Sequence, residues 1–143
     1  MVLIATLTLV ALLQQSVGVV NLGARTLVAD AMSNIDEPRQ AVARTQAEWD
    51  ALWRLHAGDQ PAPPVDFKTE MVAAIFLGSK PTPGYSAHII RGTIAGKTVT
   101  YQWIERRPER GTILAQVLTS PALFVAIPRV DGEVKFEQVA PRD

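Results

Sequence analysis

The residues that could carry chemistry in this sequence are few, and their spacing does not assemble a catalytic or metal site. The chain has two histidines, His56 and His88, and no cysteine. Thiolate nucleophiles, zinc–thiolate sites and disulfides are therefore excluded. Neither histidine belongs to the paired H-E-x-x-H spacing that a helical zinc site requires. We expect no metal, and we interpret both histidines as packed residues.

One short segment, residues 84–88, superficially resembles the nucleophile elbow of hydrolases. That motif needs a second glycine, where this sequence has His88, and a helix after the serine. The residues after Ser86 instead have the composition of a strand. No glycine-rich loop opens a helix to bind phosphate, and no pair of carboxylates can be assigned a glycosidase role. We therefore expect no enzyme and no cofactor.

The strongest candidate for binding is the loop at residues 78–85, between two predicted strands. Its two prolines stiffen it, and its glycine permits backbone geometry that other residues resist. A stiff loop that ends in an aromatic residue costs little entropy to present to a partner. The predicted partner-binding residues are Lys80, Pro81, Thr82, Pro83, Gly84, Tyr85 and Arg107. Two alternatives to a binding role stay open. The loop at residues 78–85 would be a structural turn with Tyr85 in the core, and residues 106–110, which include Arg107, would be only a solvated turn.

A helix after Thr45 is the clearest element in the sequence. Residues 45–48 form a capping box, in which the Thr45 hydroxyl accepts from the N–H of Glu48 and Glu48 reaches back. Gly58 can end the helix in a left-handed conformation. Four side chains then share one face at helical spacing: Trp49, Leu52, Trp53 and His56.

Around this helix the sequence predicts short strands that are separated by turns rich in proline and glycine. Residues 71–77 are continuously apolar, as in a strand covered on both faces, and residues 131–132 predict a tight hairpin. The predicted strands are residues 26–31, 41–43, 71–77, 85–91, 97–106, 112–119, 123–127 and 134–139. The fold class is α+β: a mainly antiparallel sheet of about seven to eight strands, curled towards a sandwich or barrel, with one capped α-helix packed on it.

The first residues predict export. Residues 2–13 are almost wholly apolar, and small residues at positions 16 and 18 suit cleavage after Gly18. The run matches a signal peptide and is shorter than the roughly 20 residues that a membrane span needs. Since no lysine or arginine precedes it, an uncleaved anchor or a buried N-terminal element are alternatives. We expect residues 1–18 to be a signal peptide or an N-terminal anchor. The protein would then be exported to the periplasm or the extracellular space, or alternatively be anchored in the membrane through this segment.

The charge balance and the aromatic content of the sequence disfavour nucleic acid and membrane surfaces as partners. The 14 basic residues balance the 14 acidic ones, so no net field attracts nucleic acid or an anionic membrane. The few aromatic residues fall mostly on core-facing positions, which disfavours a base-stacking platform. The length of 143 residues, without repeat or linker, predicts one domain. We expect a monomer that binds another protein, with no nucleic-acid binding and no membrane contact beyond the N-terminal segment.

Several segments together resemble the C-terminal domain of the PrcB family of exported bacterial proteins. The matching segments are residues 44–49 with Leu52, Trp53 and His56, then residues 66–67, 71–78 and 80–85, and finally Gln116 and residues 119–121 and 125–129. They imply a single PrcB-like domain over residues 22–141. The sequence departs from the family in having Pro83 where a glycine is common, and in lacking a lipoprotein cysteine.

The resemblance implies a non-catalytic accessory module that assists the assembly or stability of an exported, subtilisin-like protease. One alternative is a protease inhibitor that presents residues 80–85. Residues 81–85 are similar to part of the inhibitory loop of chagasin-type cysteine-protease inhibitors. The other alternative is a small-ligand or carbohydrate-binding domain, in which Trp49, Tyr85 and Trp103 would stack on the ligand.

Overall fold

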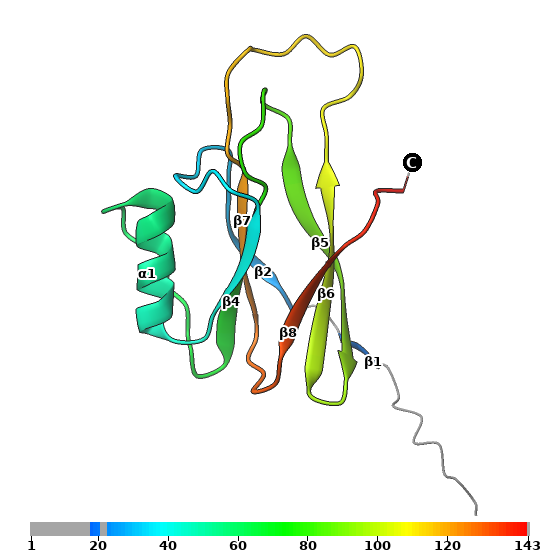
Figure 1. The fold of residues 1–143 in the computed structure, drawn as a ribbon. Coiled ribbons are helices and arrows are strands. Elements are labelled where there is room, and N and C mark those ends of the chain that lie inside the picture. The colour runs from blue at the N-terminus through cyan, green and yellow to red at the C-terminus, as the bar shows by residue number, and fades with distance from the viewer. Residues whose placement is uncertain (1–17, 21–22, 143) are drawn as a thin grey trace, which may run out of the picture.

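Two four-stranded sheets and one helix make up the part of the chain that the computed structural model describes, residues 18–20 and 23–142 (Figure 1). The elements are β1 Gly18–Val20, β2 Arg25–Asp30, β3 Arg39–Ala43, α1 Gln46–Ala57, β4 Glu70–Phe76, β5 Ser86–Ala95, β6 Thr98–Arg106, β7 Ala122–Pro128 and β8 Val134–Gln138. One sheet has the order β1-β5-β6-β8 and the other β2-β7-β4-β3. The prediction of an α+β fold with one helix is confirmed. The predicted export segment lies outside the described residues, apart from Gly18.

The continuously apolar strand β4 occupies the interior of the second sheet and serves two cores at once. Met71, Ala73 and Ile75 belong to the core between the sheets, whereas Val72, Ala74 and Phe76 lie under the helix. This division follows from the period of two in a strand, which sends successive side chains to opposite faces. The prediction that this strand is covered on both faces is confirmed.

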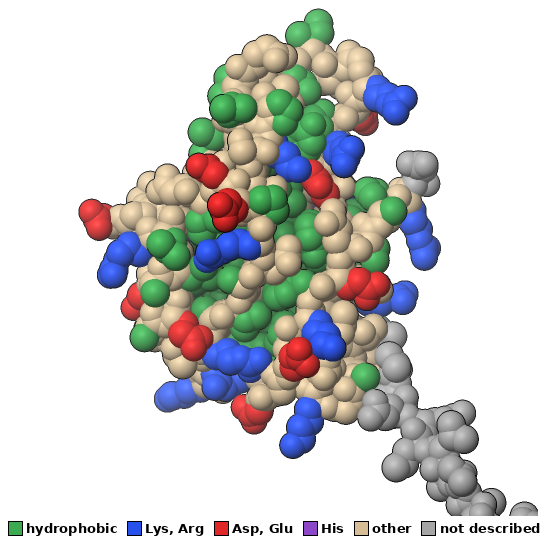
Figure 2. All heavy atoms as spheres, in the orientation of Figure 1, with side chains coloured by type: hydrophobic (Ala, Val, Ile, Leu, Met, Phe, Trp, Pro, Cys, Tyr) green, Lys and Arg blue, Asp and Glu red, His purple; other side chains and the backbone are tan. Residues whose placement is uncertain are grey.

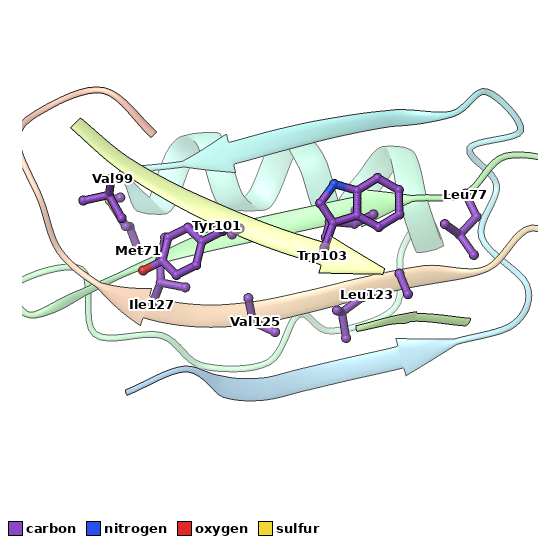
Figure 3. Packing of buried hydrophobic residues seen from close by; sticks show 11 residues of the cluster. Met71, Leu77, Val99, Tyr101, Trp103, Leu123, Val125 and Ile127 are labelled. Atoms are coloured by element: carbon purple, nitrogen blue, oxygen red, sulfur yellow. The ribbon is translucent and has the colours of Figure 1, made fainter. Parts of the chain in front are cut away.

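The core between the sheets is built from alternating residues of β6 and β7 that face each other. Its larger members include Val99, Tyr101, Trp103, Leu123, Val125 and Ile127 (Figure 3). Burial raises the pKa of the Tyr101 hydroxyl above its usual value. Since the two sheets are separate and share this core, the described strands do not close into a barrel.

Helix α1 covers the outer face of the second sheet, so the molecule has three layers (Figure 1). The Thr45 hydroxyl accepts a hydrogen bond from the N–H of Glu48 at 3.2 Å, as predicted. The Glu48 carboxylate reaches one residue further back than expected, to the N–H of Arg44 at 2.9 Å. Gly58 follows the helix with φ 63° and donates its N–H to the carbonyl of Arg54 at 2.9 Å.

The predicted hairpin at residues 131–132 is wrong, because the chain crosses there from one sheet to the other. Strand β8 pairs with β6, and the pairing is parallel. Gly132 does not have a positive φ. A Cβ at this position would instead overlap the carbonyl of Lys97, so the glycine permits a close approach rather than a hairpin turn. The Arg44 guanidinium fixes the crossing by donating to the carbonyls of Val130 and Gly132, at 2.7 and 2.6 Å.

The predicted strand at residues 112–119 is also wrong. Residues 107–118 belong to a long irregular connection between β6 and β7, and only Thr119 forms an isolated bridge, with Lys80. The composition favours a strand, but no neighbouring strand pairs with it within the described chain. A strand needs a partner as well as a suitable sequence.

Candidate partner-binding site

The predicted binding loop lies at one end of the molecule, next to the long connection between β6 and β7 (Figure 1). We call residues 80–85 and 107–118 together the loop end. Strand β1, where the described chain begins, lies near the opposite end of the two sheets. Segments that lie far apart in sequence therefore meet at the loop end, whereas β1, the first described strand, lies near the other end.

The two parts of the loop end are held together by backbone hydrogen bonds between Lys80 and Thr119, the residue that directly follows the second part. The N–H of Lys80 donates to the carbonyl of Thr119 at 2.7 Å, and the N–H of Thr119 donates back at 2.9 Å. The Thr119 hydroxyl also donates to the carbonyl of Thr82 at 3.0 Å. These three bonds hold the first half of the loop against the end of the long connection.

The Lys80 side chain stabilises the loop from within. Its Nζ lies 2.7 Å from Glu105 Oε1, with the two side chains only 21% and 12% exposed. It also lies 5.3 Å from the centroid of the Tyr85 ring, in a cation–π arrangement. Tyr85 is half-buried and packs against the core between the sheets. Lys80 and Tyr85 thus shape the loop, while Pro81 and Gly84 are its exposed residues.

Gly84 brings the loop against the turn that follows β6. Its φ is +98°, and a Cβ on this residue would lie 2.8 Å from Pro108 Cγ. The turn at residues 106–110 therefore lies directly beside the loop. Arg107 is exposed, and it lines a hollow of about 580 Å³ together with Glu105 and residues 138–141. Its side chain is thus placed beside the C-terminal segment.

The loop end also exposes large apolar side chains that the sequence analysis did not select. Ile113 is 99% exposed, Leu118 68% and Val117 51%. In Figure 2, hydrophobic side chains reach the surface at the tip of this end. The other exposed large apolar residues, Met32, Leu55 and Ile90, lie on separate elements. Sequence reasoning missed the set because it placed these residues in a strand that would have buried half of them.

The two histidines have different surroundings. His56 is buried: Nδ1 lies 2.8 Å from the hydroxyl of Ser33, and Nε2 lies 3.4 Å from Asp30 Oδ2. Desolvation lowers the His56 pKa below its usual value, and Asp30 opposes this shift. The interpretation of His56 as a packed residue is confirmed.

His88 is exposed, so its interpretation as a packed residue is wrong. Its Nε2 lies 2.8 Å from the hydroxyl of Ser86. Partial burial, and secondarily the charge of Arg106, lower its pKa. No group of three or more histidine, aspartate or glutamate residues suited to a metal ion occurs in the described chain.

A side hollow of about 300 Å³ lies where β2, β5 and β7 approach one another. Its polar lining includes Asp30, Ser86 and His88, and Tyr85 lies at its wall. Trp49 and Trp103, which the carbohydrate-binding alternative requires, are buried in the two cores. Those two rings are therefore not accessible for stacking on a ligand.

Comparison with known proteins gives one match. Residues 71–128 match the family model described as PrcB C-terminal. The matched stretch runs from β4 to β7 and includes the whole loop end. No curated protein and no solved structure matches the chain. None of the helices in the described residues is long and apolar enough to cross a membrane.

Proposed function

We propose, because residues 71–128 match the PrcB C-terminal family model, that this chain is a non-catalytic accessory module. It binds an exported protease and assists that enzyme's assembly or stability. The family match supports a protease-associated role, and the binding surface is proposed from the structure. We further propose that the module acts as an exported monomer without metal or cofactor.

The observation that carries this proposal is the exposed apolar loop end. A side chain such as Ile113 or Leu118 gains about 1.5–3 kcal/mol when a partner buries it. The hydrogen bonds between Lys80 and Thr119, and the contact of Gly84 with Pro108, hold both parts of the surface in place before binding. Less conformational entropy is then lost on association.

The position of the surface suits a module that is held or delivered through its N-terminus. Because β1 lies near the opposite end of the sheets, the loop end faces away from the point where the preceding residues join the domain. A partner at the loop end would therefore bind far from β1, the first described strand.

A photo-crosslinking experiment in the native host tests this function. The full-length chain would carry a photoreactive phenylalanine analogue at Pro81 or at Ile113. The control carries the analogue at Leu55, a residue of helix α1 that is 57% exposed. We expect an exported protease to be linked from the loop-end positions and not from Leu55. Equal linking from Leu55, or loop-end links only to proteins that are not proteases, would contradict the proposal.

Activity of the captured protease separates the accessory role from the inhibitor alternative. An accessory module raises the half-life or the yield of active protease, whereas an inhibitor blocks its turnover. Pro81 is the better site for such probes, because changing Lys80 or Tyr85 would also disturb the ion pair with Glu105 and the packing beneath the loop.

A further inference from the structure

Residues 112–118 have the sequence of a β-strand and lie outside both sheets. The segment reads Thr-Ile-Leu-Ala-Gln-Val-Leu, with three β-branched residues and no glycine or proline. In Figure 1 it forms part of the yellow-to-orange connection that runs over the end of the molecule between β6 and β7. The segment thus has strand composition but no strand partner among the described residues.

The backbone of this segment is open for pairing. Among the described residues, positions 113–118 form no backbone hydrogen bond with another backbone group; the nearest such bonds are from Thr112 to Glu109 and between Thr119 and Lys80. The side chains of the segment are mostly exposed. Its N–H and C=O groups are therefore available to a neighbouring strand, as they are on the edge strand of a sheet.

The side chains would sort into two faces if the segment became extended. Successive side chains of a strand point to opposite sides, which places Ile113, Ala115 and Val117 together on one apolar face. Thr112, Leu114, Gln116 and Leu118 would lie on the other face, which is mixed. The uniformly apolar side of the strand could thus pack on a partner, while the mixed side keeps its two polar groups in water.

Both ends of the segment are fixed, and one end is basic. Thr119 is bonded to Lys80 at the C-terminal end, and Pro108 contacts Gly84 at the N-terminal end. Arg106, Arg107 and Arg110 precede the segment, and none of them forms an ion pair within the described chain. The complementary surface is therefore a strand edge with acidic side chains at one end.

We propose that residues 112–118 add as a β-strand to an exposed sheet edge of the partner protein. This inference rests on the proposed function and specifies how the partner is held. Seven residues in extended form span roughly 23 Å, which matches a strand of ordinary length. A membrane surface is less suitable, because unpaired backbone groups are costly in lipid, whereas a sheet edge pairs them.

A position scan with a photoreactive phenylalanine analogue at each of residues 112–118 tests the strand geometry. The full-length chain is used in its native host, and linked residues of the partner are identified by mass spectrometry. We expect yields that alternate with a period of two, highest at 113, 115 and 117, and partner residues that follow one strand. Uniform yields, links only to lipid, or links only to a second copy of this chain would overturn the inference.

Two single proline variants test the proposed backbone hydrogen bonds directly. The affinity of each variant for the captured partner is measured by titration. Ala115→Pro and Gln116→Pro each remove one N–H, and neighbouring N–H groups of a strand point in opposite directions. One variant should therefore lose about tenfold in affinity and the other far less. Equal losses, or none, would contradict strand addition. Thermal midpoints provide the control, since neither N–H is bonded to another backbone group in the free protein.

The two proposals fail in distinguishable ways. An alternating scan on a partner that is not a protease would support strand addition and contradict the proposed function. Capture of a protease from Pro81 but from no position in 112–118 would support the function and overturn strand addition.

Discussion

The helix side and the loop end contain similar apolar residues, yet they use them in opposite ways. Beneath α1, Trp49 packs edge-on against Phe124 with ring centroids 5.4 Å apart. Both indole N–H groups donate to loop carbonyls: Trp49 to Pro63 at 3.0 Å and Trp53 to Gln60 at 2.7 Å. At the loop end, Ile113 is almost fully exposed and the neighbouring backbone is unpaired. The first region buries its aromatic rings and pairs both indole N–H groups, whereas the second exposes its apolar side chains to solvent.

The largest loss of stability is expected from removing a large side chain from the core beneath helix α1. Trp49→Ala should lower the free energy of unfolding by about 3–5 kcal/mol, since it opens a cavity in a packed core and leaves the Pro63 carbonyl without its donor. Urea unfolding measures this change. Leu55→Ala on the exposed face of the same helix is the control, and it should change stability by less than about 0.5 kcal/mol. A similar loss in both variants would refute the contrast.

Gly84→Ala should produce the next largest loss of stability, about 2 kcal/mol, because it combines a positive φ with the close approach of Pro108. Gly96→Ala is the matched control: its φ is +60°, but no atom lies within 4 Å of the added Cβ. We expect that control to lose only about 1 kcal/mol. Thermal unfolding compares the two variants, and equal losses would mean that Pro108 yields to the added methyl group.

The ion pair inside the loop end should contribute less. A double-mutant cycle with Lys80→Met and Glu105→Gln should give a coupling energy of about 1 kcal/mol, since both side chains are partly shielded from solvent. Unfolding in low salt and at high salt measures the coupling and its screening. A coupling near zero would show that the Thr119 bonds alone hold the loop.

Lowering the pH should weaken the helix side through His56. Desolvation lowers the pKa of His56 in the folded protein, so below about pH 6.5 the unfolded chain takes up a proton that the folded protein does not. Stability is then lost as the pH falls from about 6.5 towards the folded pKa. The effect should be moderate, because Asp30 lies 3.4 Å from Nε2 and attracts the proton.

Urea unfolding between pH 7.5 and 5 measures this slope. His88→Gln removes the other histidine whose pKa is lowered, so a slope that persists in this variant belongs to His56. A slope that vanishes with His88 would assign the effect to the exposed histidine instead.

The smallest effect on stability is expected from the segment that we propose to be essential for binding. The triple variant Ile113→Ser, Val117→Ser and Leu118→Ser should change the free energy of unfolding by less than about 0.5 kcal/mol, because these side chains are exposed. Partner capture through Pro81 should nevertheless fall at least tenfold. A stability loss as large as that of Gly84→Ala would mean that the segment is packed, and would remove the contrast between the two regions.

Local signals predicted the helix side well, because its information lies close together in the sequence. The capping threonine, the spacing of Trp49, Trp53 and His56, and the terminal Gly58 all act within a few turns. Strand β4 was likewise readable, since an uninterrupted apolar run must be covered on both faces.

The errors concern residues whose role depends on distant neighbours. Gly132 makes room for the Lys97 carbonyl rather than forming a hairpin, and no local pattern reveals that contact. Ile113 and Val117 have strand composition, but the sequence does not reveal that they lie outside every strand in the described part of the chain. For the candidate site, the loop at residues 80–85 was predictable from its prolines and glycine, whereas its contact with Pro108 and the exposed apolar segment were not.

The position of β7 also constrains the order in which the domain can assemble. Within the described residues, β2 pairs only with β7, so that Arg25 lies opposite Ala126. The first strand of this sheet thus waits for nearly the entire chain before it gains a neighbour. Pairings between such distant segments make folding slow, and a ribosome must release β7 before the sheet can close. The sheet that contains β2 therefore closes late in folding, and its unpaired early strands are exposed to aggregation in the interval.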